Sequence, residues 1–320
     1  MTQKTPIYPL KNAPNKGNIY WLASYPKSGN TWTRAFIANL LNENIGAVDI
    51  NMLDTGAIAS GRGWVENALD FDINELSHDE IDKLRPSAYC WLSQQITVPE
   101  YHKIHDAYTL LPNGQALIPK EATKGALYIM RNPLDVAVSF AHHLGCSIDQ
   151  SITNMSKSNF SFAGKSDRSC NQLRQQLLSW SGHVTSWVDD NSLNRLVVRY
   201  EDMQVNPLNS FGKIARFLKL PSNDNQVLEA LSHCRIDKLQ AQEAKSAFKE
   251  KSAKAATFFR KGIVGDWQNT LTKSQINTLI NDHREVMQRF GYLDAQEQPI
   301  CDFSVTSKED KSNVFEAITS

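Results

Sequence analysis

The sequence has no long apolar run, no excess of one charge and no paired cysteines. No stretch of about 18 consecutive apolar residues occurs in its 320 residues, so we expect no membrane-spanning helix. Lys and Arg number 34, as do Asp and Glu, and this balance argues against a surface that binds nucleic acid as a whole. The expected partner is neither a membrane nor nucleic acid, while a local basic site for a small anion stays possible.

The five cysteines are scattered, with no CxxC pair and no zinc-ligand spacing; they are Cys90, Cys146, Cys170, Cys234 and Cys301. We predict that they are reduced thiols in a cytoplasmic protein. The first 16 residues are polar and lack the apolar segment of a signal peptide, which agrees with this location. Because we find no carboxylate cluster typical of a metal site, we expect no metal.

Short apolar runs alternate with amphipathic segments along the chain. Strands are predicted at 18–24, 126–130 and 195–200, and each is followed by a helix that begins near residue 31, 133 or 207. Such alternation predicts an α/β fold with a central parallel sheet flanked by helices. Two more helices are predicted at 172–188 and 274–290. The segment 145–168 is rich in Ser, Asn and Lys, and we expect a long connection or lid there, with room for short helices.

The most informative segment is YPKSGNTW at 25–32, where the first strand becomes a helix. Free backbone N–H groups and the helix dipole favour an anion at such a place. Gly29 allows close approach, Lys27 adds a charge, and Ser28 and Thr31 add hydroxyls. An ordinary surface turn is the alternative, and the order of lysine and glycine differs from that of the ATP-binding pattern GxxxxGK[ST]. Trp32 either packs in the core or stacks on a nucleobase.

This octamer resembles the phosphosulfate-binding loop of the cytosolic-type sulfotransferases, usually written YPKSGTTW. Those enzymes use 3′-phosphoadenosine 5′-phosphosulfate (PAPS) as sulfuryl donor and release 3′-phosphoadenosine 5′-phosphate (PAP). The only difference inside the octamer is Asn30, which can still donate and accept hydrogen bonds. The resemblance implies a P-loop-like three-layer sandwich in which the loop binds the donor through Lys27, Ser28, Gly29, Asn30, Thr31 and Trp32.

A second motif, RNPLDVAVS at 131–139, follows a predicted strand. Arg131 leaves the end of that strand, where ligands of open α/β sheets gather, and a guanidinium can hold a phosphate by two hydrogen bonds. A local pair between Arg131 and Asp135 is the alternative reading. In the resembled family, the arginine and serine at this spacing grip the 3′-phosphate of PAPS, which implies this role for Arg131 and Ser139.

The segment RKGIVGDW at 260–267 has two cations and two glycines, which suit a flexible loop over an anion, although a solvated basic turn has the same composition. RKGxxGDW is the third signature of the resembled family and closes over the same phosphate. The resemblance therefore adds Arg260, Lys261 and Gly262 to the donor site. Tyr200 resembles a family tyrosine that lies against the adenine nucleotide, although a tyrosine ending a strand can also be a core residue.

Transfer of a sulfuryl group to a hydroxyl needs a group that removes the acceptor proton, and histidine is the natural base near neutral pH. Of eight histidines, His105 stands out in the sequence YHKIH, because Lys103 and His105 are two apart and point to the same side of a strand. His102 is the alternative. The resembled family carries Lys-x-His here with the histidine as base, and often continues with Leu-Pro, whereas this chain has Asp106-Ala107.

The mechanism that follows has three residues in named roles. His105 takes the proton of the acceptor, Lys27 stabilises the charge on the departing phosphate oxygen, and Lys103 positions the sulfuryl group. Positioning and charge stabilisation dominate such transfers, so no metal is required in principle.

The acceptor is expected to be a small molecule with a hydroxyl or an amine. Its pocket is predicted from 46–101 and 140–168, which lack donor motifs. Possible lining residues, each of which could instead be core, are Trp64, Tyr89, Trp91, Phe140, His142 and His143. The dimer segment of animal members is not matched at 269–282, which leaves the oligomeric state open and favours a bacterial member.

Together with these patterns, the resemblance implies one sulfotransferase domain over 1–320, with a core of about 18–292 and a peripheral tail of about 296–320. The function predicted is PAPS-dependent sulfation of a small molecule. Two alternatives share the fold: a P-loop kinase of nucleotides or small molecules, and a non-catalytic nucleotide-binding protein.

Overall fold

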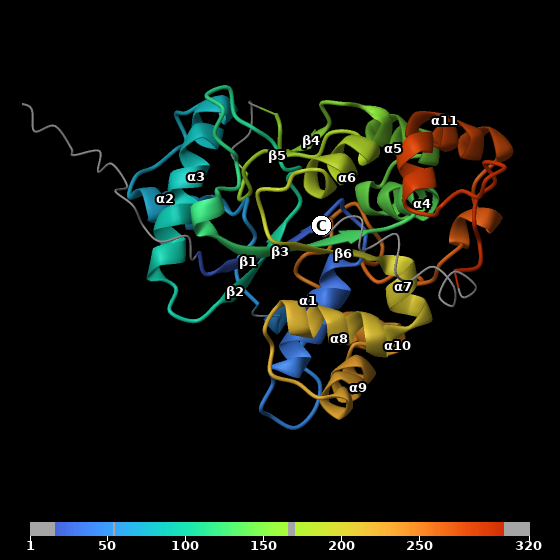
Figure 1. Ribbon diagram of the computed structural model, residues 1–320, viewed down its shortest axis with the longest axis horizontal. Coiled ribbons are helices and arrows are strands. Elements are labelled where there is room, and N and C mark those ends of the chain that lie inside the picture. Colours follow the sequence, from blue (N-terminus) through green and yellow to red (C-terminus); the bar gives the residue numbers. More distant parts are fainter. Residues whose placement is uncertain (1–16, 54, 166–169, 304–320) are drawn as a thin grey trace, which may run out of the picture.

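Four parallel strands in the order β2-β1-β3-β6 form the centre of the protein (Figure 1). The computed structural model describes residues 17–53, 55–165 and 170–303. The strands are β1 (Ile19–Ser24), β2 (Glu100–Ile104), β3 (Thr123–Met130) and β6 (Arg195–Arg199). The three strands predicted from apolar runs are confirmed, and β2 adds the edge strand that carries Lys103.

Side chains of the central strands alternate between two separate apolar clusters. On β1, Trp21 and Ala23 join one cluster, while Tyr20 and Leu22 join the other. Successive side chains of a strand point to opposite faces, and both faces of this sheet are covered. For this reason β1 and β3 read as continuous apolar runs rather than as alternating polar and apolar residues.

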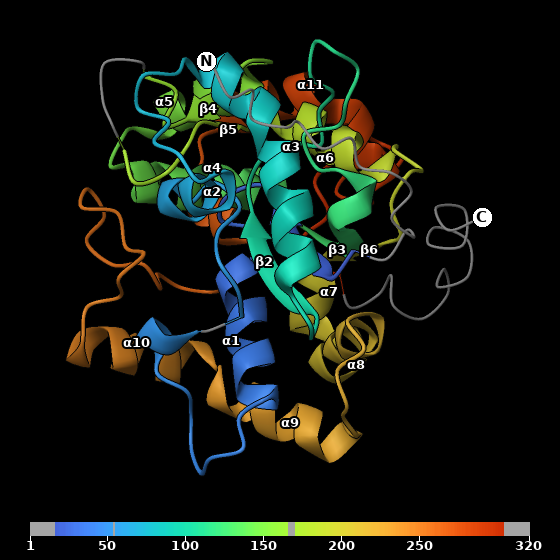
Figure 2. The same ribbon diagram turned by 90° about the vertical axis from the view of Figure 1, so that its left-hand side faces the viewer.

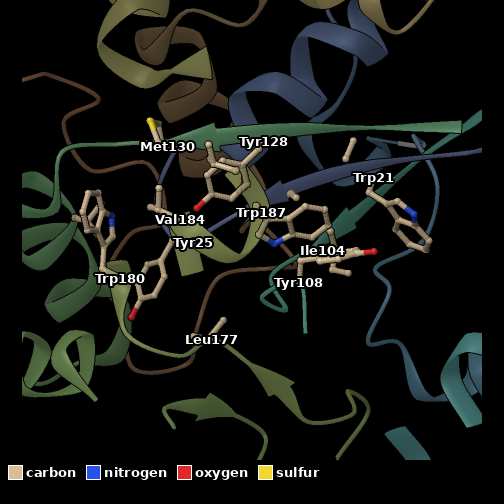
Figure 3. Packing of buried hydrophobic residues seen from close by; sticks show 14 of the residues in the cluster. Trp21, Tyr25, Ile104, Tyr108, Tyr128, Met130, Leu177, Trp180, Val184 and Trp187 are labelled. Atoms are coloured by element: carbon tan, nitrogen blue, oxygen red, sulfur yellow. The ribbon is translucent and has the colours of Figure 1, made fainter. Parts of the chain in front are cut away.

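Within the described residues, six helices cover the face on which Trp21 lies. They are α2 (Arg62–Leu69), α3 (His78–Gln95), α4 (Pro133–Leu144), α5 (Ile148–Ser156), α6 (Trp180–Val188) and α11 (Lys273–Arg289). Figure 3 shows the aromatic side chains that fill this layer, among them Trp21, Tyr128 and Trp187. The polar atoms of these three are partnered: the indole of Trp187 donates to the backbone oxygen of Asp106 at 3.0 Å, that of Trp21 donates to the Thr123 hydroxyl at 2.8 Å, and the Tyr128 hydroxyl lies 2.9 Å from Nδ1 of His183. The layer therefore packs tightly behind the residues that follow β2.

Five helices of the described part of the chain cover the opposite face. They are α1 (Asn30–Leu40), α7 (Tyr200–Val205), α8 (Pro207–Phe217), α9 (Asp224–His233) and α10 (Ile236–Lys245). Both ribbon views place α1, α8 and α9 together on this side of the sheet (Figures 1 and 2). Phe211 of α8 packs against Trp32 and Phe36 of α1, with ring centroids 4.9 and 4.6 Å away. The two helical layers and the sheet between them confirm the predicted three-layer α/β sandwich.

The helix predicted at 172–188 begins only at Trp180, so its first half was wrong. Residues 172–179 are not helical, and within them β5 (Gln175–Gln176) pairs with β4 (Ser161–Phe162) in a small antiparallel sheet. Leu173 and Leu177 fit a helical repeat, but they also fit a repeat of two, in which Gln175 between them is buried. Because Gln175 is polar, the sequence did not show an apolar residue at every second position, which would have indicated a strand.

The remaining ordered turns are short 3₁₀ helices: η1 (Ile50–Met52), η2 (Lys120–Ala122) and η3 (Asp266–Asn269). All five cysteines lie in the described part of the chain and are free thiols. No helix in the described ranges is long and apolar enough to cross a bilayer. Most of the predicted tail, 304–320, lies outside the described residues, as do residues 1–16.

Candidate active site

All four parallel strands end at the same edge of the sheet, and a predicted site residue follows each of them. Lys27 follows β1, His105 follows β2, Arg131 follows β3, and Tyr200 follows β6. These residues line one cleft of about 1060 Å³. Ligands of open α/β sheets bind at this edge. The sheet topology thus brings together residues that are far apart in the sequence.

Fourteen residues were predicted for the donor site and the chemistry, and thirteen of them line this cleft. They are Lys27, Gly29, Asn30, Thr31, Trp32, Lys103, His105, Arg131, Ser139, Tyr200, Arg260, Lys261 and Gly262. Ser28 is fully buried and is not part of the lining. The alternative base, His102, does not line the cleft either; it packs between Trp21 and Trp64, and Glu100 lies 2.7 Å from its Nε2.

The loop after β1 has a backbone shape that glycine makes possible. Gly29 has φ 108° and precedes α1, and a Cβ there would come within 2.8 Å of the Tyr200 ring. Asn30 donates from Nδ2 to the backbone oxygen of Leu22 at 2.7 Å, which fastens the loop to its own strand. The buried hydroxyl of Ser28 has no partner among the described residues. A buried polar group without a partner fits a loop that binds an anion.

Arg131 connects three of the predicted motifs. Its guanidinium donates to the backbone oxygens of Lys27 at 3.2 Å and Ile263 at 2.9 Å, and it lies 4.3 Å above the Tyr200 ring. The expected local pair with Asp135 is long, at 3.8 Å. Asp135 instead accepts backbone N–H groups of the segment after Ile263. Arg131 therefore holds the three segments around one point, where its planar fork can also meet a phosphate.

The segment 260–267 places two cations beside one carboxylate. Arg260 and Lys261 each lie 2.6 Å from an oxygen of Asp266. Gly262 has φ 64°, and a Cβ there would meet Ile236 at 2.9 Å. The segment is anchored on α4, because Asp135 accepts the backbone N–H groups of Gly265 and Trp267. It can thus present both cations to the cleft.

Lys27 lies in a crowded cationic environment. Burial lowers its pKa to about 7, and repulsion from Lys103, Arg131 and Arg260 adds to this, while Glu243 acts in the opposite direction. Its ammonium also lies 4.0 Å from the ring centroid of Phe258. Several cations that depress the pKa of a lysine in a cleft indicate a site for an anionic ligand.

His105 has one ring nitrogen fixed by the backbone. Its Nδ1 lies 2.8 Å from the backbone oxygen of Ser24, so we assign the proton to Nδ1 and the free lone pair to Nε2. Burial, with Lys103 as the next cause, holds the pKa of His105 well below 6.5. The backbone oxygen of His105 is itself held by Nε2 of His183 at 3.1 Å. The imidazole is therefore neutral and oriented at pH 7, as a general base must be.

A buried ion pair lies next to His105 in the chain. It involves Asp106, one of the two residues that stand here where the resembled family often has Leu-Pro. Asp106 and Arg85 are fully buried and joined by two hydrogen bonds of 3.0 and 2.8 Å. Arg85 also bonds Asp82 at 3.1 Å and the hydroxyl of Tyr89 at 2.8 Å. The pair ties α3 to the segment that carries His105. No local pattern links residues 21 apart, so the sequence alone did not reveal this pair.

The predicted acceptor residues lie mostly elsewhere. Of the six, only His143 lines the cleft; Tyr89 and Phe140 are fully buried in the core, and Trp91 is exposed. Ile58 and Phe162, which also line the cleft, fall within the predicted ranges 46–101 and 140–168 but were not singled out, whereas Arg34, Gln172, Gln175 and Glu250 lie outside those ranges and were missed. Gln172 and Gln175 were missed because the segment 172–188 was predicted to be a helix. Glu250 sits in the lysine-rich stretch 249–251, which resembles an ordinary solvated surface.

Comparison with known proteins decides the family. The model of the sulfotransferase domain matches residues 19–291, which is most of the chain. The chain belongs to the sulfotransferase family. This sulfotransferase is 27% identical to sulfotransferase 1B1 of Canis lupus familiaris over 79% of its own length and 78% of the relative's. It is 26% identical to flavonol 3-sulfotransferase of Flaveria bidentis over 82% and 79%.

Solved structures agree with this sulfotransferase in fold. A mouse sulfotransferase complexed with PAP has a TM-score of 0.55 at 22% identity, over 87% of this chain and 85% of that one. Retinol dehydratase with androsterone and PAP has a TM-score of 0.53 at 18% identity, over 85% and 81%. The predicted fold and enzyme class are confirmed. Within the described ranges, no group of three or more His, Cys, Asp or Glu side chains is arranged to hold a metal ion.

Proposed function

We propose that this sulfotransferase moves a sulfuryl group from PAPS to a hydroxyl or amine of a small-molecule acceptor. The observation that carries the proposal is the convergence of Lys27, His105, Arg131 and Tyr200 from four strand ends on one cleft. The PAP in the related mouse structure supports the same nucleotide as donor. The family match gives no support to the kinase alternative.

The donor side fits a nucleotide with several negative charges. Residues 27–32 provide backbone N–H groups at the start of α1, and Ser28 carries an unpartnered buried hydroxyl there. Arg131, Ser139 and the 260–262 segment would hold the 3′-phosphate. Trp32 and Tyr200, whose ring centroids lie 5.7 Å apart, would flank the base. Bound PAPS supplies the sulfuryl group and a leaving phosphate.

Three residues of the chain act in the transfer itself. His105 Nε2 accepts the proton of the acceptor as its oxygen or nitrogen bonds to sulfur. Lys27 donates to the bridging oxygen as the sulfur–oxygen bond to phosphate breaks, and Lys103 orients the sulfuryl oxygens. The proton ends on His105 and the electron pair ends on PAP, so the exchange balances. The acceptor lies on the side formed by Ile58, His143 and Phe162.

A titration separates this function from its alternatives. We expect PAP to bind without magnesium and far more tightly than ATP or GTP, because the cleft offers cations where PAP has phosphates. Isothermal calorimetry with the three nucleotides measures this. A magnesium-dependent preference for ATP would contradict the proposal, and tight PAP binding without PAPS turnover over a broad acceptor library would favour a non-catalytic protein.

Binding of PAP should be coupled to protonation of Lys27. The pKa of Lys27 is about 7 in the unliganded protein, so the group is mostly neutral at pH 8.5, and a bound anion raises its pKa again. We therefore expect uptake of about one proton on binding between pH 7.5 and 9.5, with affinity falling as the pH rises. Calorimetry at pH 8.5 in buffers of different ionisation enthalpy measures the uptake.

The matched variant is Lys27→Met, which should lose this uptake as well as affinity. Uptake that persists unchanged in Lys27→Met would assign the proton to another group and contradict the prediction. The exposed Lys273 at the start of α11 gives the control, Lys273→Met, which should keep both uptake and affinity.

A further inference from the structure

One carboxylate of the cleft lies between two cations of different segments. Glu250 Oε1 is 2.6 Å from Nη1 of Arg34, and its Oε2 is 2.9 Å from Nζ of Lys103. Arg34 belongs to α1, Lys103 to β2, and Glu250 to the stretch between α10 and η3. The side chains are 6%, 14% and 22% exposed, so water competes little with these contacts.

The cluster has a fixed end and a free end. Arg34 is secured by hydrogen bonds from Nη2 to the backbone oxygen of Leu53 at 3.3 Å and from Nε to the hydroxyl of Thr55 at 3.4 Å. Within the described residues, Glu250 is the only group that accepts a hydrogen bond from the Lys103 ammonium. The anchored Arg34 therefore fixes the position of Glu250, and Glu250 in turn fixes the position of the Lys103 ammonium. The flexible side chain of Lys103 has no other hydrogen bond at its end among the described residues.

The same carboxylate balances the charge around Lys103. Burial lowers the pKa of Lys103 and Arg34 lowers it further, whereas Glu250 raises it. Lys27, His105 and His143 also face this ammonium, and none of them offers a negative charge. Burial acts to raise the pKa of Glu250, but Lys103 and Arg34 outweigh it and bring it to about 2. Glu250 thus stays ionised over the working pH range.

We propose that Glu250 is a positioning residue for sulfuryl transfer, holding the Lys103 ammonium in the cleft beside His105. This inference rests on the proposed function, since Lys103 is there the group that orients the sulfuryl oxygens. Glu250 itself touches neither donor nor acceptor in this scheme. It acts by fixing where Lys103 points and by keeping Lys103 charged among cations.

The test compares Glu250→Gln, Glu250→Asp and the control Glu229→Gln, whose side chain is exposed on α9. PAPS turnover is followed with the acceptor found in the library, from pH 6 to 10. We expect Glu250→Gln to lower kcat about 10- to 100-fold, because a small misplacement of a reacting group has effects of this size. In the pH profile of kcat for Glu250→Gln, we expect the alkaline limb to move to lower pH. Glu250→Asp should recover part of the lost rate, and the control should match the original protein.

A spectroscopic measurement makes the result independent of the acceptor. Titration of lysine labelled with ¹³C at Cε, assigned with Lys103→Met, should show a lower pKa of Lys103 in Glu250→Gln while PAP affinity stays within about threefold. A purely structural role would lower Tm or raise KM without moving that pKa or the alkaline limb, and this outcome overturns the proposal.

Failure of the proposed function would give a different pattern. In that case the unaltered protein would lack PAP binding or PAPS turnover, and Lys103 could still titrate as expected. The double variant Lys103→Met with Glu250→Gln should lose no more kcat than Lys103→Met alone, because the two residues act as a unit. A further loss in the double variant would show that Glu250 acts apart from Lys103.

Discussion

Replacement of His105 with alanine should lower kcat about 10²- to 10⁴-fold, the usual contribution of a general base. Its Nε2 is the free nitrogen of a neutral imidazole whose other nitrogen is held by Ser24. PAP affinity should stay within about threefold, because His105 lies on the reacting side of the cleft rather than among the phosphate cations. Steady-state turnover of PAPS and calorimetry with PAP measure the two quantities.

The alternative base gives the comparison. His102→Asn should lower Tm, since His102 is buried against Trp21 and Trp64, and should retain kcat within about tenfold. Near-normal turnover in His105→Ala with unchanged PAP binding would remove His105 from the mechanism. Because the pKa of His105 lies well below 6.5, the acid limb of kcat/KM for the donor should also lie below pH 6.5.

Replacement of Arg85 with methionine should lower the free energy of unfolding by about 3–5 kcal/mol, because it leaves Asp106 charged and buried without its partner. Both side chains are fully buried, and two hydrogen bonds join them. Urea unfolding followed by circular dichroism measures the change. The exposed pair of Arg284 and Glu297 supplies the control, for which Arg284→Met should cost less than about 1 kcal/mol.

A double variant tests the reason for this loss. Arg85→Met combined with Asp106→Leu removes both charges, and an apolar replacement of a buried ion pair is often neutral in stability. We expect it to regain most of the stability lost in Arg85→Met. If the double variant is less stable than Arg85→Met, the loss comes from the packing of Arg85 on Tyr89 and Asp82 rather than from the unpaired charge.

The placement of the predicted donor residues in one cleft could be foreseen because they stand next to strands in continuous motifs. Lys27 and Arg131 lie within three residues of the ends of β1 and β3, so a predicted strand already locates them. Parallel strands then bring these ends to one edge without any knowledge of side-chain packing. The third motif, at Arg260, was found only through the family resemblance.

Individual residues of the proposed acceptor side could not be predicted in this way, although Ile58, His143 and Phe162 lie within the predicted ranges 46–101 and 140–168. The wall of this side comes from connections whose positions depend on tertiary packing, such as Ile58 beside Lys103 and the extended segment at Gln175. Aromatic residues chosen from the sequence for this side, such as Tyr89 and Phe140, are instead buried in the hydrophobic core. Glu250 looked like a surface charge because its partners, Arg34 and Lys103, are 216 and 147 residues away.

Sequence changes in the residues that follow the four strands should have different effects from changes in the connections between the strands. Residues directly after the strands are tied to the sheet, and in the proposed function they hold the nucleotide or take part in the transfer, so we expect few changes there to be tolerated. The segments 56–58 and 172–176 line the proposed acceptor side of the cleft and lie outside the four strands, although Ile58 pairs with Lys103 of β2. We therefore expect exchange of these two segments between relatives to change which molecule is sulfated and to leave the proposed catalytic residues in place, whereas exchange of 246–259 would also remove Glu250.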